Sequence, residues 1–311
     1  MLPCEVYLDR GLISGIVRTA VERCIASSGL SRIPNSPGEL FNSSQVTSIK
    51  AEIIRAGRKL WERQYVDGSG GNISARISPE YVICTPTMLS KGDLLLEDIS
   101  LVDLENHQIV GARPQTSEIL LHLEIYKAVP EARAVIHCHP PYATAHAVAG
   151  MVPQGNLVSE QELFIGPVAL AAYETPGTLA FAKAALPLVR GHNTILLSNH
   201  GLVCWADSVT HAEWYTEVVE TYCKTLVIAK QLRPDLTEIP SSKINDLLTL
   251  KKRLGLPDPR IPVDESAVRA SAGNLAADSA CLFPHDVSDL EMESLVSRLS
   301  GEIVQFLEKR A

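Results

Sequence analysis

Two histidines separated by one residue stand at the end of an apolar run near the middle of the chain. Residues 134–136 have the pattern of a short strand, and His137 and His139 follow them. Because side chains two positions apart in a strand lie on the same side, both imidazoles can reach one metal ion at about 2.0–2.1 Å. Pro140 ends the strand pattern there. This motif alone also fits two ordinary polar residues at a strand end.

A third histidine follows a second strand pattern. The apolar run Thr194 to Leu197 leads to His200, and the next residue, Gly201, suits a tight turn. Three histidines with one open coordination position are typical of a catalytic zinc site, whereas a structural zinc is normally closed by four protein ligands, commonly cysteines. The combination therefore favours catalysis over a structural role.

Two hydroxyl groups precede a carboxylate at Thr116, Ser117 and Glu118, where a helical pattern over residues 117–128 begins. Hydroxyls and free amides at a helix N-terminus suit a phosphate group. The ordinary alternative is an N-cap, in which Thr116 or Ser117 caps the helix and Glu118 complements its dipole. Taken alone, the segment favours the ordinary N-cap.

A glycine-rich stretch surrounds Ser69. Gly68, Gly70 and Gly71 give this stretch main-chain amides that can approach an anion closely. The same composition fits a flexible turn, so the stretch alone does not assign a binding site.

Strand and helix patterns alternate around these residues. The predicted strands are residues 81–84, 134–137, 194–197 and 202–205, and the predicted helices in this region are residues 117–128 and 212–231. The alternation predicts an α/β fold.

Both ends of the chain carry amphipathic helical patterns that are joined to the centre by linkers. Pro34 and Pro37 are expected to prevent a helix in the first linker. The predicted parts are an N-terminal amphipathic helix at 1–27, a linker at 28–45, a central domain at 46–235, a C-terminal helical extension at 236–256, a second linker at 257–287 and a C-terminal amphipathic helix at 288–311.

Composition and charge exclude several classes of partner. The net charge is −8 and no run of Lys or Arg is long enough to follow a phosphate backbone, so we expect no nucleic-acid partner. No apolar stretch approaches the roughly 20 residues that span a bilayer, and the first residues lack a secretory pattern, so we expect a cytoplasmic protein without a membrane partner. The seven cysteines are scattered without a Cys-x-x-Cys pair, which argues against a disulfide framework.

Five segments, taken together and in order, resemble the class II aldolase/adducin family. They are Gly70-Gly71-Asn72-Ile73-Ser74, Thr85-Pro86-Thr87, Thr116-Ser117-Glu118, His137-Cys138-His139 and Asn199-His200-Gly201. The resemblance covers residues 46–235. Among the catalytic members it is most similar to L-fuculose-1-phosphate and L-rhamnulose-1-phosphate aldolases, which cleave a ketose 1-phosphate to dihydroxyacetone phosphate and L-lactaldehyde. It implies a three-layer α/β/α sandwich that assembles as a homotetramer.

The resemblance also implies which residues bind the metal and which one transfers the proton. It places Zn²⁺, or another divalent ion, on His137, His139 and His200, one per subunit, as a Lewis acid for the enediolate that forms when the sugar C3–C4 bond breaks. It makes Glu118 the general acid/base at C3, which can also ligate zinc when no substrate is bound.

Five residues match the positions where the family holds the substrate's phosphate. They supply neutral donors rather than a Lys or Arg clamp, and would position the sugar relative to the metal. These residues are Ser69, Asn72, Thr87, Thr116 and Ser117.

Two positions depart from the family pattern. Met88 stands where the family usually has a glycine beside the phosphate, and its side chain is expected to narrow that pocket. A tyrosine that acts on the aldehyde half is missing near residues 157–158, where Glu160 or Glu162 is the candidate replacement. The sequence therefore leaves the aldehyde substrate open.

Two other functions remain compatible with the resemblance. A pentulose-phosphate 4-epimerase, or a related dehydratase or decarboxylase, would use the same metal and enediolate chemistry. A non-catalytic adducin-like module has the fold without the metal site, and the intact histidines and Glu118 argue against it.

The terminal helices are similar to the encapsulation peptides of bacterial microcompartment cargo proteins. That similarity implies helix-in-groove binding to a shell protein, and hence a place inside such a compartment. The alternative is that these helices pack on the surface of the protein's own tetramer.

Overall fold

The computed structural model describes residues 36–256 and 258–261. Within these residues one sheet has the strand order β4-β3-β2-β1-β5-β8-β7-β6, and every neighbouring pair except β6 and β7 is antiparallel. The strands are β1 Asn72–Arg76, β2 Tyr81–Cys84, β3 Ser100–Asp103, β4 Gln108–Val110, β5 Ala134–Cys138, β6 Ala169–Ala171, β7 Thr194–Leu197 and β8 Gly201–Ala206. The α/β prediction is confirmed.

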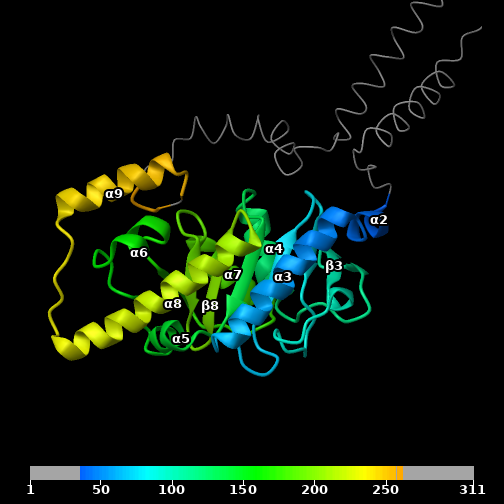
Figure 1. Ribbon diagram of the computed structural model, residues 1–311, viewed down its shortest axis with the longest axis horizontal. Helices are drawn as coiled ribbons and strands as arrows, with labels where there is room; N and C mark the ends of the chain where they lie inside the picture. The colour runs from blue at the N-terminus through cyan, green and yellow to red at the C-terminus, as the bar shows by residue number, and fades with distance from the viewer. Residues whose placement is uncertain (1–35, 257, 262–311) are drawn as a thin grey trace, which may run out of the picture. The chain divides into compact units, whose positions relative to one another are not determined.

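Helices cover both faces of this sheet (Figure 1). Their bounds are α2 Pro37–Phe41, α3 Ser44–Glu62, α4 Ile119–Ala128, α5 Pro141–Val148, α6 Ser159–Phe164, α7 Leu179–Ala185, α8 Val209–Leu232 and α9 Ser241–Arg253, with short 3₁₀ turns η1 Leu96–Asp98 and η2 Leu186–Leu188. Helices α4 and α7 pack in one apolar core with one side of the strands, and α3 with the start of α8 packs in another on the opposite side. The expected three-layer α/β/α sandwich is confirmed.

The alternation along β5 assigns the site to one face. Val135 belongs to the core under α4 and α7, whereas Ile136 belongs to the core under α3. Because alternate side chains share a face, His137 lies on the α4 side. Ile73 of β1 packs under α3, so its neighbours Asn72 and Ser74 also face α4.

The long helix α3 forms from a clear amphipathic pattern. The hydroxyl of Ser43 accepts a hydrogen bond from the amide of Val46 and so caps its first turn. The apolar positions Ile53, Ala56 and Leu60 follow at helical spacing and are buried against the sheet. Burial of each Leu or Ile stabilises the fold by about 1.5–3 kcal/mol.

The structure differs from the linker expected at residues 28–45. In the described part of that range, Pro37–Phe41 form α2, and Ser36 caps the amide of Glu39. Proline is compatible with the first helical turn because its missing N–H needs no partner there, so Pro37 begins a helix rather than preventing one. Phe41 is buried, and the ammonium of Lys50 lies 3.2 Å from its ring centre.

Helix α9 lies inside the range 236–256, where a helical extension is expected. The predicted helices at 1–27 and 288–311 lie outside the described residues, as does the predicted linker at 257–287 except for residues 258–261. Within the described chain, no helix is both long and apolar enough to cross a bilayer.

Candidate active site

Two adjacent antiparallel strands carry the three predicted metal ligands. His137 belongs to β5 and faces Val203 of β8 in the register, and His139 follows the end of β5. His200 lies in the hairpin loop between β7 and β8. The preceding Asn199 has φ of 54°, a left-handed conformation that Asn tolerates in such turns.

A glycine is required where the hairpin approaches β5. A Cβ on Gly201 would lie 2.5 Å from the main-chain oxygen of Cys138 and 2.7 Å from the ring of His139. Because no side chain intervenes, His200 comes close to the end of β5.

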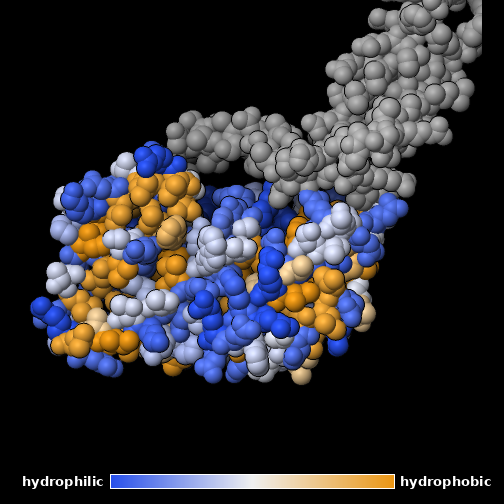
Figure 2. Space-filling view, viewed as in Figure 1, coloured by the Kyte–Doolittle hydropathy of each residue, from blue (hydrophilic) through white to orange (hydrophobic). Residues whose placement is uncertain are grey.

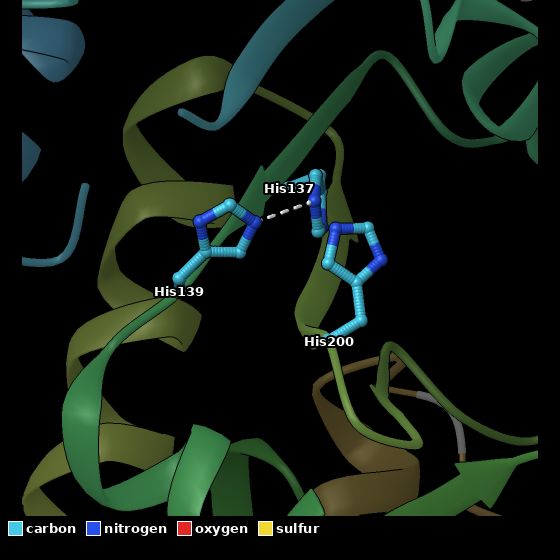
Figure 3. Close-up of side chains that lie close together, drawn as sticks. All are labelled: His137, His139 and His200. Atoms are coloured by element: carbon cyan, nitrogen blue, oxygen red, sulfur yellow. Dashed lines mark hydrogen bonds between the residues drawn. The ribbon is translucent and has the colours of Figure 1, made fainter. Parts of the chain in front are cut away.

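The three imidazoles converge on one point (Figure 3). The Nε2 atoms of His137 and His139 are 3.1 Å apart, and one nitrogen from each ring lies within 4.8 Å of the others. Tetrahedral zinc with ligands at about 2.0–2.1 Å requires nitrogens about 3.3 Å apart. His137 is fully buried, whereas His139 and His200 are half-buried, so the group is open on one side.

The protonation of His137 suits a metal ligand. Its Nδ1 lies 2.9 Å from the main-chain oxygen of Leu202, which can only accept, so Nδ1 carries the hydrogen and Nε2 keeps a free lone pair. Burial, followed by the charges of His139 and His200, holds the pKa of His137 well below its ordinary value. Three imidazoles that bring one nitrogen each to the same place fit a divalent metal ion such as zinc.

Glu118 lies against this group of histidines. Its Oε2 is 3.3 Å from Nε2 of His137, and its Oε1 is 3.5 Å from Nε2 of His200. The side-chain amide of Asn72 donates a 2.8 Å hydrogen bond to Oε2. Glu118 is only 9% exposed, so its carboxylate is held where it can reach both the metal ligands and a bound substrate.

The start of α4 is not an ordinary capped helix end. Glu118 occupies the N-cap position, and no side chain accepts a hydrogen bond there. The amide of Glu118 lies 3.5 Å from the hydroxyl of Thr116, at the limit of a hydrogen bond. Of the two interpretations of this segment, simple capping by Thr116 or Ser117 is therefore not what the structure shows.

Two of the expected phosphate segments lie side by side. The amide of Thr87 donates to the oxygen of Pro114, and the amide of Thr116 donates to the oxygen of Thr85, both at 3.1 Å. The hydroxyl of Thr85 accepts from the amide of Ile73, which joins the start of β1 to the same place. The turn before β1, the loop after β2 and the N-terminus of α4 therefore meet.

The five expected phosphate residues are not equally available. Ser69 and Ser117 are exposed, Thr87 is half-buried and Thr116 is buried. Asn72 is buried and its amide is directed at Glu118, so its side chain contacts the acid/base candidate.

Lys91 lies beside this group and was not among the residues expected from the sequence. Its ammonium donates to the main-chain oxygens of Ser69, at 3.0 Å, and Leu89, at 2.5 Å. The side chain is 1% exposed, and burial lowers its pKa to about 8. Within the described residues no carboxylate pairs with it. The one feature of the sequence that indicates a place near the phosphate residues is that Lys91 follows Thr87 by four positions.

The two departures from the family pattern have different structural outcomes. Met88 has φ of 56°, in the left-handed region that favours glycine, and its side chain is 81% exposed. The carboxylate of Glu162 is buried and accepts hydrogen bonds from the amide of Asn156 and from Arg260, so it is already engaged. Glu160 is exposed.

Comparisons with known proteins identify the family. The model of the class II aldolase and adducin N-terminal domain matches residues 51–227, more than half of the chain. The chain belongs to this family, as the five segments implied, and the homologues indicate a lyase.

Two curated relatives have different activities. L-fuculose phosphate aldolase of Methanococcus maripaludis is 36% identical over 183 residues, which cover 58% of this chain and 98% of the relative. 3-Oxo-tetronate 4-phosphate decarboxylase of Haemophilus influenzae is 30% identical over 179 residues, covering 56% and 85%.

Solved structures show the same fold. An L-fuculose 1-phosphate aldolase superposes with a TM-score of 0.62 at 27% identity, covering 68% of this chain and 97% of the other. YgbL of Klebsiella pneumoniae, described as an aldolase, epimerase or decarboxylase, gives 0.59 at 27% identity, covering 64% and 97%.

Proposed function

We propose that this protein is a zinc-dependent aldolase that cleaves a ketose 1-phosphate to dihydroxyacetone phosphate and L-lactaldehyde, with L-fuculose 1-phosphate or L-rhamnulose 1-phosphate as substrate. One observation carries the proposal. The carboxylate of Glu118 lies within 3.5 Å of two histidines of the triad while its helix begins at the segment expected to bind phosphate. A sugar phosphate bound at that segment would present its reacting carbons to both groups.

The chemistry divides between the metal ligands and Glu118. A divalent ion held by His137, His139 and His200 would supply Lewis-acid stabilisation of the negative charge on the sugar's C2 and C3 oxygens. Glu118 would hold and return the proton at C3. Its burial and its bond from Asn72 fix the carboxylate in place for that transfer.

Binding of the phosphate would fall to the loops around the start of α4. Thr87, Thr116, Ser117 and Ser69 contribute hydroxyls, and the N-terminus of α4 contributes its dipole. Lys91 adds a positive charge without a carboxylate partner in the described residues, so it can be neutralised by the substrate.

A decarboxylase of a 3-oxo-tetronate 4-phosphate is the second candidate. It is favoured by the Haemophilus influenzae relative, which aligns over 85% of its length, and by the absence of a tyrosine at residues 157–158. Loss of carbon dioxide leaves a comparable enediolate, so the same His137, His139, His200 and Glu118 would serve. A pentulose-phosphate 4-epimerase would use the same groups, but would rejoin the two fragments of the sugar instead of releasing them.

Metal analysis and a product assay test the proposal together. We expect about one zinc per chain, and release of dihydroxyacetone phosphate from fuculose or rhamnulose phosphate rather than from ribulose phosphate. His200→Ala should abolish both metal and activity, and Glu118→Gln should keep the metal but lower kcat at least about 100-fold. His211→Ala is the matched control, because His211 pairs with Asp207 outside the triad. Full lyase activity in His200→Ala would contradict the proposal.

The assembly of the protein is part of the same proposal. A homotetramer would cover apolar residues that the single chain exposes, and such residues gather over the C-terminal part of α8, where Ile228 and Leu232 are 47% and 83% exposed (Figure 2). Docking to a microcompartment shell would use residues 1–27 or 288–311. A fluorescent reporter fused to either segment should concentrate in compartments, and a diffuse reporter would contradict docking by that end.

A further inference from the structure

Behind Glu118, a chain of buried hydrogen bonds runs between β1 and α4. Asn72 Nδ2 lies 2.8 Å from Glu118 Oε2, and Asn72 Oδ1 lies 2.5 Å from His122 Nε2. On the other side of the imidazole, His122 Nδ1 lies 2.7 Å from the hydroxyl of Ser74, which lies 2.9 Å from the hydroxyl of Tyr126. His122, Ser74 and Tyr126 are 0% exposed, so water does not interrupt the chain.

The spacing of these residues explains how the chain forms. Glu118, His122 and Tyr126 follow one another at intervals of four residues, so they lie along one side of α4 from its N-cap to its last turn. Asn72 and Ser74 are two residues apart on β1 and face the same side of the sheet. The strand residues fill the gaps between the helix residues, so the chain alternates between the two elements.

The hydrogen bonds can run in only one direction when Glu118 is ionised. The carboxylate only accepts, so the Asn72 amide donates to it and the Asn72 oxygen must accept from His122. Nε2 of His122 therefore carries the hydrogen, and Nδ1 accepts from Ser74, whose oxygen accepts from Tyr126. Burial, followed by the charge of His137, lowers the pKa of His122 to about 3, which keeps the ring in this neutral form.

We propose that His122 is a positioning residue, and that the chain Tyr126–Ser74–His122–Asn72 fixes the orientation of the Glu118 carboxylate beside the histidine triad. The proposal rests on the acid/base role proposed for Glu118. Without the hydrogen bond from His122, the buried oxygen of Asn72 has lost its donor, and only the contact with Glu118 still orients the amide. The Asn72 side chain would then turn toward another donor, and the Glu118 carboxylate would lose the bond that holds it where it reaches the substrate.

A matched pair of variants tests this role. In His122→Gln the amide nitrogen lies near the place of Nε2 and can still donate to Asn72, whereas in His122→Asn the amide lies near the place of Nδ1 and cannot. We expect His122→Asn to lower kcat about 10–100-fold with KM within about 2-fold, and His122→Gln to stay within about 3-fold of the wild type. Zinc content should be unchanged in both, because His122 is not a ligand. Equal kcat in the two variants, or a loss confined to KM, would overturn the proposal.

If a variant does not fold, a measurement on the wild-type protein still tests the proposed hydrogen-bond chain. With ¹⁵N-labelled histidine, His122 should give the signals of a neutral ring protonated at Nε2, unchanged between about pH 5 and pH 8. His122→Gln, or Ser74→Ala if that variant folds better, assigns the signal. A ring protonated at Nδ1, or a charged ring at pH 6, overturns the proposal.

The two tests also separate this inference from the proposed function. If the wild type cleaves no sugar phosphate, the aldolase proposal fails, and the tautomer of His122 still decides whether the chain exists. If the wild type releases dihydroxyacetone phosphate and both His122 variants do so equally, the positioning role fails while the aldolase proposal stands.

Discussion

The ammonium nitrogen of Lys91 lies 3.0 Å from the main-chain oxygen of Ser69, so a buried positive charge joins the glycine-rich turn before β1 to the loop after β2. Both segments are expected to contact the substrate's phosphate. A buried cation bonded only to carbonyl oxygens is poorly compensated, and a doubly charged phosphate is the partner that would compensate it.

Replacement of Lys91 should therefore weaken substrate binding. We expect Lys91→Met to raise KM for the sugar phosphate about 10–100-fold with kcat within about 3-fold, because a charge-assisted hydrogen bond contributes about 1.5–3 kcal/mol. Lys127→Met is the matched control, since Lys127 is paired with Glu124 on the surface of α4. Steady-state kinetics measure both, and an unchanged KM in Lys91→Met would remove Lys91 from the phosphate site.

The pH dependence of stability should also reveal Lys91. Burial lowers its pKa from 10.5 to about 8, so between these values the unfolded chain binds more protons than the native one. This group alone makes the native state more stable as pH rises through that window. Between pH 7 and pH 10.5, the free energy of unfolding of the wild type should accordingly rise by up to about 3 kcal/mol relative to that of Lys91→Met. Urea unfolding at several pH values measures the difference, and a difference independent of pH would contradict the assignment.

Met88 provides a test of backbone strain beside the site. Its φ of 56° costs a non-glycine residue about 1–2 kcal/mol, and the greater freedom of unfolded glycine offsets part of that gain. We expect Met88→Gly to raise the free energy of unfolding by up to about 1 kcal/mol and to lower KM. Met88→Ala removes the side chain but keeps the strained φ, so it should lower KM and leave the free energy of unfolding unchanged. Equal stability of the two variants would show that the strain is negligible.

Asp258 holds the segment after α9 against that helix. Its carboxylate lies 3.1 Å from the ammonium of Lys251, and both side chains are 0% exposed. Because Asp258→Asn leaves the Lys251 charge without this partner, the free energy of unfolding should fall by about 3–5 kcal/mol. Asp246→Asn breaks the exposed pair with Lys243 and should change it by less than about 0.5 kcal/mol. Thermal unfolding of the two variants distinguishes them, and equal losses would contradict this account.

The elements that carry the triad could be predicted because their signals are local. The bounds of β2 and β7 agree with the predicted strands, and the two-residue period alone put His137 and His139 on one side. The segments around Asn72, Glu118 and His200 were connected by resemblance rather than by pattern. Their contacts depend on the sheet order β1-β5-β8, which no local pattern encodes.

Other features of the site could not be derived from local patterns. Lys91 reads as an ordinary surface lysine until the fold buries it beside Ser69. Glu162 was a candidate for the missing tyrosine, but its engagement by Arg260 depends on residues nearly one hundred positions away. The sequence does not show whether Pro37 stands inside a helix, where it would interrupt it, or at the first turn, where it begins one as in α2.

The most direct test of the central claim is to measure dihydroxyacetone phosphate released from L-fuculose 1-phosphate by the zinc-loaded protein, before and after removal of the metal by a chelator. The account predicts equimolar dihydroxyacetone phosphate and L-lactaldehyde, loss of both with the metal, and recovery when zinc is restored. Absence of both products, with carbon dioxide released from 3-oxo-tetronate 4-phosphate instead, would contradict the aldolase proposal and assign the site to the decarboxylase.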